Sequence, residues 1–229
     1  MSIVLIFLAT SCGKFEDDVF SLVAVPPSFP QENWEKVMNP EDFGWRVEAL
    51  DDIRDYAKSI KTEALMIIDK GKLIAAYGDT DKKYYVASVR KSYLSLLYGY
   101  YVDSLIALDA TLSDYAIDDK NPTLNNQEKA ATVRHLLTSS SGIYHKSAAN
   151  SDNDDLPARN SDAPGERFYY NNWDFNALGT IFSKRTGKSI FEDFHVRIGR
   201  KIGLEDFNGN RMADLNTVMY LNTPLIILI

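Results

Sequence analysis

The chain has 229 residues, of which 45% are hydrophobic and 25% are charged, and its formal net charge at pH 7 is −7. This length allows a sizeable core in one domain or slightly more, and the composition is that of a globular protein, not of a disordered one. The acidic balance and the lack of any basic cluster argue against nucleic acid as a partner.

The N-terminus carries a short apolar stretch and the only cysteine of the chain. Residues 3–9 are too few to span a bilayer as a helix. The sequence LATSC at residues 8–12 resembles the lipobox of a bacterial lipoprotein signal, although no lysine or arginine precedes it. The resemblance implies a signal peptide over residues 1–12 and a lipid anchor at Cys12. The mature protein would then be held on a membrane of the bacterial cell envelope, in the periplasm or at the surface.

The next segments predict an α+β order. Residues 13–30 are typical of a linker and end in prolines, so one domain is expected over residues 31–229. A helix is predicted over residues 47–60, where apolar side chains recur mostly every third residue. A buried strand over residues 64–68, a turn and a returning strand over residues 73–77 then predict a hairpin inside a sheet.

Ser88 and Lys91 stand just before the apolar run of residues 93–102. At a spacing of three, their side chains share one face of a helix. A helix that starts at Ser88 would gather a hydroxyl, an amine and free backbone N–H groups at one point. Acyl transfer needs such a nucleophile, base and oxyanion donors, and burial and the helix dipole would favour the neutral amine. The spacing alone is a weak signal, because it recurs at Ser11 and Lys14.

The middle of the chain predicts a short helix and a long loop. Thr132 is expected to be the N-cap of a helix over residues 133–138. The polar segment over residues 144–163 has the length of a functional rim or a lid.

The last third of the chain predicts three helices and a final strand. An apolar stripe that begins at Phe175 predicts a helix that stops at Gly187. A capping box at Ser189 predicts the start of another helix. Residues 212–221 are expected to be helical, and residues 225–229 could form a strand or the edge of a longer element.

Four short motifs occur along the chain in an order that resembles the order of motifs in a known family. They are Ser88-x-x-Lys91, Leu136-Leu137-Thr138-x-x-Ser141-Gly142, Pro164-Gly165-x-x-Phe168, and Tyr170-x-Asn172 followed by Leu178-Gly179. In this order, over residues 45–205, they resemble the β-lactamase-related serine hydrolases, which include class C β-lactamases, D,D-peptidases, esterases and amide hydrolases. The resemblance implies an α+β fold of the β-lactamase/transpeptidase type, with a sheet domain, a helical domain and the site between them.

The resemblance also implies a role for each matched residue. Ser88 would be acylated and its backbone N–H would bind the oxyanion, with Lys91 as proton acceptor or electrostatic partner. Tyr170 would shuttle a proton to the leaving group or to water, and Asn172 would bind the substrate. The Glu-x-x-Leu-Asn stretch of class A β-lactamases is absent, which favours this tyrosine mechanism. The implied substrate is a small or peptide-like amide, lactam or ester.

No cofactor and no metal ion are expected. His135, His145 and His195 lie far apart without metal-ligand spacing, so each is expected to be structural or on the surface. His145 alone lies on the polar loop near the expected mouth of the site.

One element of the family is missing from the sequence. The Lys-Thr-Gly motif, or its His-x-Gly variant, would line the site on a strand and supply a second oxyanion donor, but neither occurs here. We therefore expect a chain without the final strands of the family and with an incomplete sheet. Two functions remain open: a monomeric, active serine hydrolase, or an impaired remnant that binds penicillin-like or peptidoglycan-like ligands.

Overall fold

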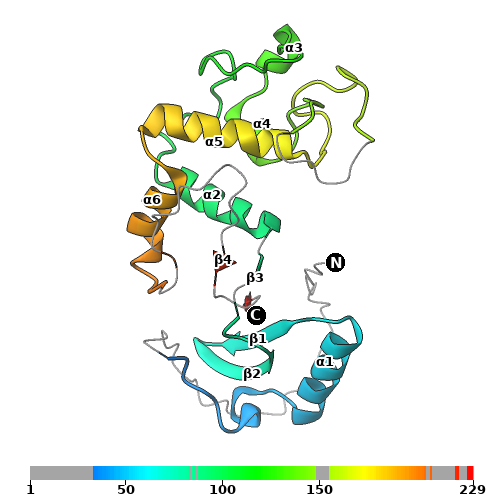
Figure 1. The fold of residues 1–229 in the computed structure, drawn as a ribbon, viewed down its shortest axis with the longest axis vertical. Coiled ribbons are helices and arrows are strands. Elements are labelled where there is room, and N and C mark those ends of the chain that lie inside the picture. Colours follow the sequence, from blue (N-terminus) through cyan, green and yellow to red (C-terminus); the bar gives the residue numbers. More distant parts are fainter. Residues whose placement is uncertain are drawn as a thin grey trace, which may run out of the picture.

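The computed structural model describes residues 33–82, 84–85, 87–147, 155–204, 207, 220–221 and 226–228. The predicted signal peptide, Cys12 and the linker therefore lie outside the described residues. Among the described helices, none combines the length and the apolar character that crossing a membrane requires. Figure 1 shows a sheet region and a helical region that follow one another along the long axis of the molecule.

The sheet region is built on the predicted hairpin. β1 (Ala64–Asp69) pairs antiparallel with β2 (Lys72–Gly78). Lys70 and Gly71 both have positive φ angles, 49° and 78°, as a tight two-residue hairpin turn requires. β5 (Ile226–Leu228) pairs in parallel with the other edge of β1, which gives the strand order β2-β1-β5. The hairpin and the strand at the end of the chain are therefore confirmed.

A second, smaller pair of strands lies between the sheet region and the helices (Figure 1). β3 (Tyr84–Tyr85) pairs antiparallel with β4 (Tyr220–Leu221). The helix predicted over residues 212–221 is therefore wrong at its end, because pairing with β3 holds Tyr220 and Leu221 in an extended conformation. Residues 212–219 lie outside the described residues.

α1 (Val47–Ser59) confirms the predicted helix that precedes the hairpin. A short 3-10 turn, η1 (Pro40–Phe43), comes before it. In the apolar stripe of α1 and its C-cap, only Ala57 is fully buried. The exposed members of the stripe are Val47, Ile53, Tyr56 and Ile60. The spacing of the apolar residues thus predicts the helix correctly, but most of these apolar side chains are exposed to solvent.

The helical region contains the larger core. Its elements are α2 (Arg90–Gly99), α3 (Asn126–Lys129), α4 (Val133–Leu137), α5 (Asn172–Thr186), α6 (Ile190–Phe194) and a π-helical turn (His195–Gly199). α5 packs on α2 and α4, and α6 packs against both α2 and α5 (Figure 1). Leu97, Leu136 and Phe182, from three different helices, are fully inaccessible in this core. The packing of α5 on α2 fixes the two helices that carry the predicted site.

The capping residues predicted from the sequence agree with the structure at some helix ends and not at others. The Thr132 hydroxyl accepts a hydrogen bond from the His135 backbone N–H, which confirms the predicted N-cap of α4. Gly187, with a φ of 67°, ends α5 as predicted. The predicted helix after Ser189 is confirmed as α6, with Ser189 at its N-cap position, but the capping box is wrong because the Ser189 side chain makes no capping hydrogen bond. Asp193 anchors this helix instead, since its carboxylate accepts a 2.6 Å hydrogen bond from the Tyr101 hydroxyl of the segment after α2.

Candidate active site

Ser88 lies where the sheet region passes into the helical region. A 3-10 turn (Ala87–Val89) carries Ser88 and leads directly into α2. The α-helix begins at Arg90, two residues later than the sequence predicts. Ala87 has a φ of 44°, a left-handed conformation that costs a residue with a Cβ about 1–3 kcal/mol. Strain of this kind is typical of functional sites, and here it directly precedes the exposed Ser88.

Three side chains converge at this turn. Lys91 Nζ donates hydrogen bonds to Ser88 Oγ at 2.8 Å and to the Tyr170 hydroxyl at 2.6 Å. The Tyr170 hydroxyl in turn donates to Ser88 Oγ at 2.7 Å, although the two residues are 82 positions apart. Each of the three polar atoms therefore contacts the other two. A hydroxyl, an amine and a phenol within one proton transfer of each other can support acyl transfer.

Two aromatic rings enclose the amine of Lys91. Its Nζ lies 4.9 Å from the ring centroid of Tyr170 and 5.0 Å from that of Phe175. The two rings are themselves 5.9 Å apart. These two ring contacts hold the amine in place beside the Ser88 and Tyr170 hydroxyls. The sequence indicated Phe175 only as a member of a core stripe, and no local pattern separates these two uses.

The position of the Tyr170 phenol depends on its neighbour Asn171. The side-chain amide of Asn171 donates to the backbone oxygens of Ile143 at 3.1 Å and His145 at 3.0 Å. Its oxygen accepts from the Trp173 backbone N–H at 3.1 Å and so caps α5. The Tyr-x-Asn motif indicates its first and third residues as functional and leaves out this middle one. The preference of asparagine for N-cap positions is the signal that could have found it.

Three of the predicted site residues, Ser88, Lys91 and Tyr170, are thus in mutual contact. Asn172 is the first residue of α5 and is half-buried, and its role in binding substrate stays a prediction. The predicted lipidation at Cys12 falls outside the described residues.

Comparisons with known proteins connect this geometry to a family. A family model described as Beta-lactamase matches residues 48–213, which is more than half of the chain. The chain belongs to the β-lactamase family. A search of curated protein sequences gives no match.

Two solved structures share the fold of this β-lactamase-family chain. An octameric penicillin-binding protein homologue from Pyrococcus abyssi matches with a TM-score of 0.53 and 24% identity, over 70% of this chain and 44% of the other. A candidate beta-lactamase from Bacteroides dorei DSM 17855 matches with a TM-score of 0.54 and 21% identity, over 70% of this chain and 52% of the other. The predicted α+β fold of the β-lactamase/transpeptidase type is therefore confirmed. The chain spans about half the length of these two structures.

The second and third motifs of this family member contain glycines that the backbone requires. Gly142 has a φ of 69°, and a Cβ there would lie 2.6 Å from the backbone oxygen of Asp162. Gly165 has a φ of 90°, and a Cβ there would lie 3.1 Å from Nε2 of His135. At Gly142 both the positive φ and the backbone clash require glycine, and at Gly165 the positive φ favours it. These two motifs therefore hold the loops beside the site and supply no reacting group.

Asp174 is a buried carboxyl group in the first turn of α5. Its side chain is fully inaccessible, and Oδ1 accepts a 2.6 Å hydrogen bond from the Ser141 hydroxyl. Burial raises the pKa of Asp174 to about 8, against the lowering effect of that hydrogen bond. Its Oδ2 has no hydrogen-bond partner among the described residues. Asp174 is therefore expected to be mostly protonated at neutral pH, a feature that the sequence did not indicate.

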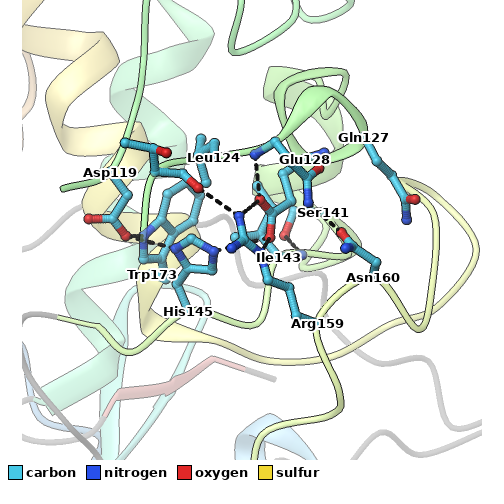
Figure 2. A network of polar contacts seen from close by, with 12 residues as sticks. Asp119, Leu124, Gln127, Glu128, Ser141, Ile143, His145, Arg159, Asn160 and Trp173 are labelled. Atoms are coloured by element: carbon cyan, nitrogen blue, oxygen red, sulfur yellow. Dashed lines mark hydrogen bonds and ion pairs between the residues drawn. The ribbon is translucent and has the colours of Figure 1, made fainter. Parts of the chain in front are cut away.

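A polar network fastens the loops that precede Tyr170 (Figure 2). The buried His145 ring lies between two carboxylates, with Nδ1 3.0 Å from Asp119 and Nε2 3.0 Å from Glu128. Arg159 donates to both oxygens of Glu128, at 2.9 and 2.6 Å. Burial alone would raise the pKa of Glu128, but the Arg159 hydrogen bond and other neighbours hold it below its usual range. The Trp173 indole N–H, which donates to Asp119 at 2.8 Å, joins this network to α5.

His145 is thus a structural residue, which is one of the two roles, structural or surface, that were expected for each histidine. In the part of the chain that the structure describes, no three His, Cys, Asp or Glu side chains are grouped so that they could hold a metal ion.

Proposed function

We propose that this β-lactamase-family chain is a serine hydrolase that cleaves an amide, lactam or ester through an acyl-enzyme at Ser88. The observation that carries the proposal is the set of three mutual hydrogen bonds among Ser88, Lys91 and Tyr170. A packed aromatic or a solvated helix start would not need all three polar atoms within 2.8 Å of each other.

In the acylation step, Ser88 Oγ attacks the carbonyl carbon, and Lys91 Nζ is the group that we assign to accept its proton. The bond to the leaving nitrogen or oxygen then breaks, and that atom takes a proton from the Tyr170 hydroxyl. Lys91 returns a proton to the Tyr170 phenolate across the 2.6 Å contact. The net result is one proton moved from Ser88 to the leaving group, which is why the amine and the phenol must touch each other as well as the serine.

Deacylation uses the same groups in reverse. A water molecule adds to the acyl carbon and gives a proton to the Tyr170–Lys91 pair. Ser88 Oγ leaves and recovers that proton, and the carboxylic acid product departs. The backbone N–H of Ser88, in the turn before α2, is a donor for the oxyanion of both tetrahedral intermediates. Asn172, at the start of α5, is the residue that we assign to substrate binding.

Ligand binding without turnover is the second candidate function. The described residues supply one assigned oxyanion donor, the backbone N–H of Ser88, and each such donor contributes about 100- to 1000-fold in rate. The two candidates differ in the fate of the acyl-enzyme, which is released as product in one and persists in the other.

Labelling with a fluorescent fluorophosphonate tests the nucleophile. We expect labelling of the unchanged protein and none of Ser88→Ala, whereas Ser183→Ala, at an exposed serine of α5, should label normally. A fluorescent penicillin then separates the candidates, because turnover removes the label with time and binding alone does not. Equal labelling of the protein and its Ser88→Ala variant by both probes would refute the assignment of Ser88.

We also propose that the protein is anchored to a bacterial envelope membrane through a lipid on Cys12. The support is the sequence pattern at residues 8–12. Radioactive palmitate should label the protein and not its Cys12→Ser variant, and the variant should leave the membrane fraction. Labelling that survives the substitution would refute the anchor.

A further inference from the structure

A pocket of about 230 Å³ lies beside the candidate active site, between α2, α4 and α5. Its apolar walls are formed by Leu94, Leu137, Phe175 and Leu178. The remaining lining comes from α2 and consists of Lys91 and the exposed Ser92 and Ser95.

The pocket begins at a side chain that also touches the nucleophile. Lys91 lines the pocket, and its Nζ lies 2.8 Å from Ser88 Oγ and 5.0 Å from the ring centroid of Phe175. One amine therefore separates the nucleophilic oxygen from the pocket wall. The Lys91 side chain therefore contacts both the nucleophilic oxygen and the interior of the pocket.

The size and the chemistry of the pocket restrict its occupant. An apolar cavity of about 150 Å³ admits benzene, and pockets for drug-sized ligands span about 300–1,000 Å³. A pocket of about 230 Å³ therefore suits a phenyl ring or a short alkyl chain. No carboxylate and no guanidinium is among the described residues that line it, and the Lys91 amine already bonds two hydroxyls. An uncharged, apolar group fits these walls best.

We propose that this pocket binds a short alkyl or phenyl substituent on the acyl group that Ser88 receives. The proposal rests on the acyl-enzyme function proposed above and specifies its substrate class. The acyl group stays on Ser88 through both steps, so a pocket reached past Lys91 contributes to each. Transfer of one methylene from water to an apolar site gains about 0.8 kcal/mol, or about fourfold in affinity. Two added methylenes on the acyl chain should therefore raise kcat/KM about 15-fold.

Ser95→Leu tests the pocket, because Ser95 is exposed on α2 and a leucine there would fill space without disturbing the core. The readout is the ratio of kcat/KM for p-nitrophenyl butyrate to that for p-nitrophenyl acetate. We expect a ratio of about 15 for the unchanged protein and close to 1 for Ser95→Leu. Ser183→Leu, the same change on the exposed face of α5, should keep the original ratio. A ratio near 1 in the unchanged protein, or an unaltered ratio in Ser95→Leu, overturns the proposal.

A binding measurement separates this proposal from the proposed function. Ligand-detected NMR with methyl hexanoate on the Ser88→Ala protein needs no turnover. Binding that Ser95→Leu abolishes and Ser183→Leu retains supports the pocket even where ester hydrolysis is absent. Hydrolysis that depends on Ser88, together with no binding of methyl hexanoate, retains the serine hydrolase and refutes the pocket.

Discussion

Replacement of Asp174 by asparagine should remove a pH-dependent loss of stability from this protein. Burial raises the pKa of the Asp174 carboxyl to about 8, against a usual value of 3.8. The folded protein therefore keeps a proton that the unfolded chain releases above pH 4. Stability from this group is complete below the unfolded pKa and is lost progressively as the pH rises toward 8. The asparagine side chain has no carboxyl proton to lose, and the Ser141 hydroxyl can still donate to its amide oxygen.

The magnitude follows from the span of pH between the two pKa values. One pH unit in this range corresponds to about 1.4 kcal/mol, and pH 5 and pH 7 both lie between about 4 and 8. The free energy of unfolding of the unchanged protein, relative to Asp174→Asn, should therefore fall by about 2.5 kcal/mol from pH 5 to pH 7. No discount for solvent screening applies, because Asp174 is fully inaccessible.

Urea unfolding of both proteins at pH 5, 6 and 7 and constant ionic strength measures this difference. The other titrating groups, including the three histidines, are common to both proteins and cancel in the comparison. Asp52→Asn makes the same substitution at an exposed carboxyl group of α1 and should show no such trend. Parallel pH profiles for the unchanged protein and Asp174→Asn would mean that Asp174 is ionised in the folded state, and the reasoning would be wrong.

Three further predictions follow from the site and its support. Tyr170→Phe should lower kcat about 100- to 10,000-fold with little change in KM, because it removes a proton-transfer group. The control variant Tyr169→Phe should change kcat less than about twofold. Equal kcat values for the two variants would exclude the phenol from proton transfer. Asn171→Ala should lower the free energy of unfolding by about 2–3 kcal/mol, measured in urea, because two backbone oxygens and the N-cap of α5 lose their partner. Gly142→Ala should lower the thermal midpoint, because its Cβ would lie 2.6 Å from the Asp162 oxygen, and an unchanged midpoint would contradict that contact.

The sheet region shows which strands a local sequence pattern predicts and which strand pairings it does not. The hairpin was predictable because a continuous apolar run and a tight turn are both properties of neighbouring residues, and the structure has the strands within one residue of the expected ends. The partner of β1 on its other edge, Ile226–Leu228, was not predictable, because strand pairing depends on contacts between distant segments. The same reason explains Tyr220 and Leu221, which pair with β3 where a helix was expected.

The features of the candidate site also fall into those that local sequence predicts and those that depend on the tertiary fold. The spacing of Ser88 and Lys91 was enough to predict that they are neighbours, because three residues bring two side chains together in any helical turn. The contact of the Tyr170 hydroxyl with both of them depends on the packing of α5 on α2, which joins residues 82 positions apart. The supporting roles of Asn171, Phe175 and Asp174 also depend on the tertiary structure. Hydrogen bonding, ring contact and burial are properties of the folded surroundings, and a residue's identity does not contain them.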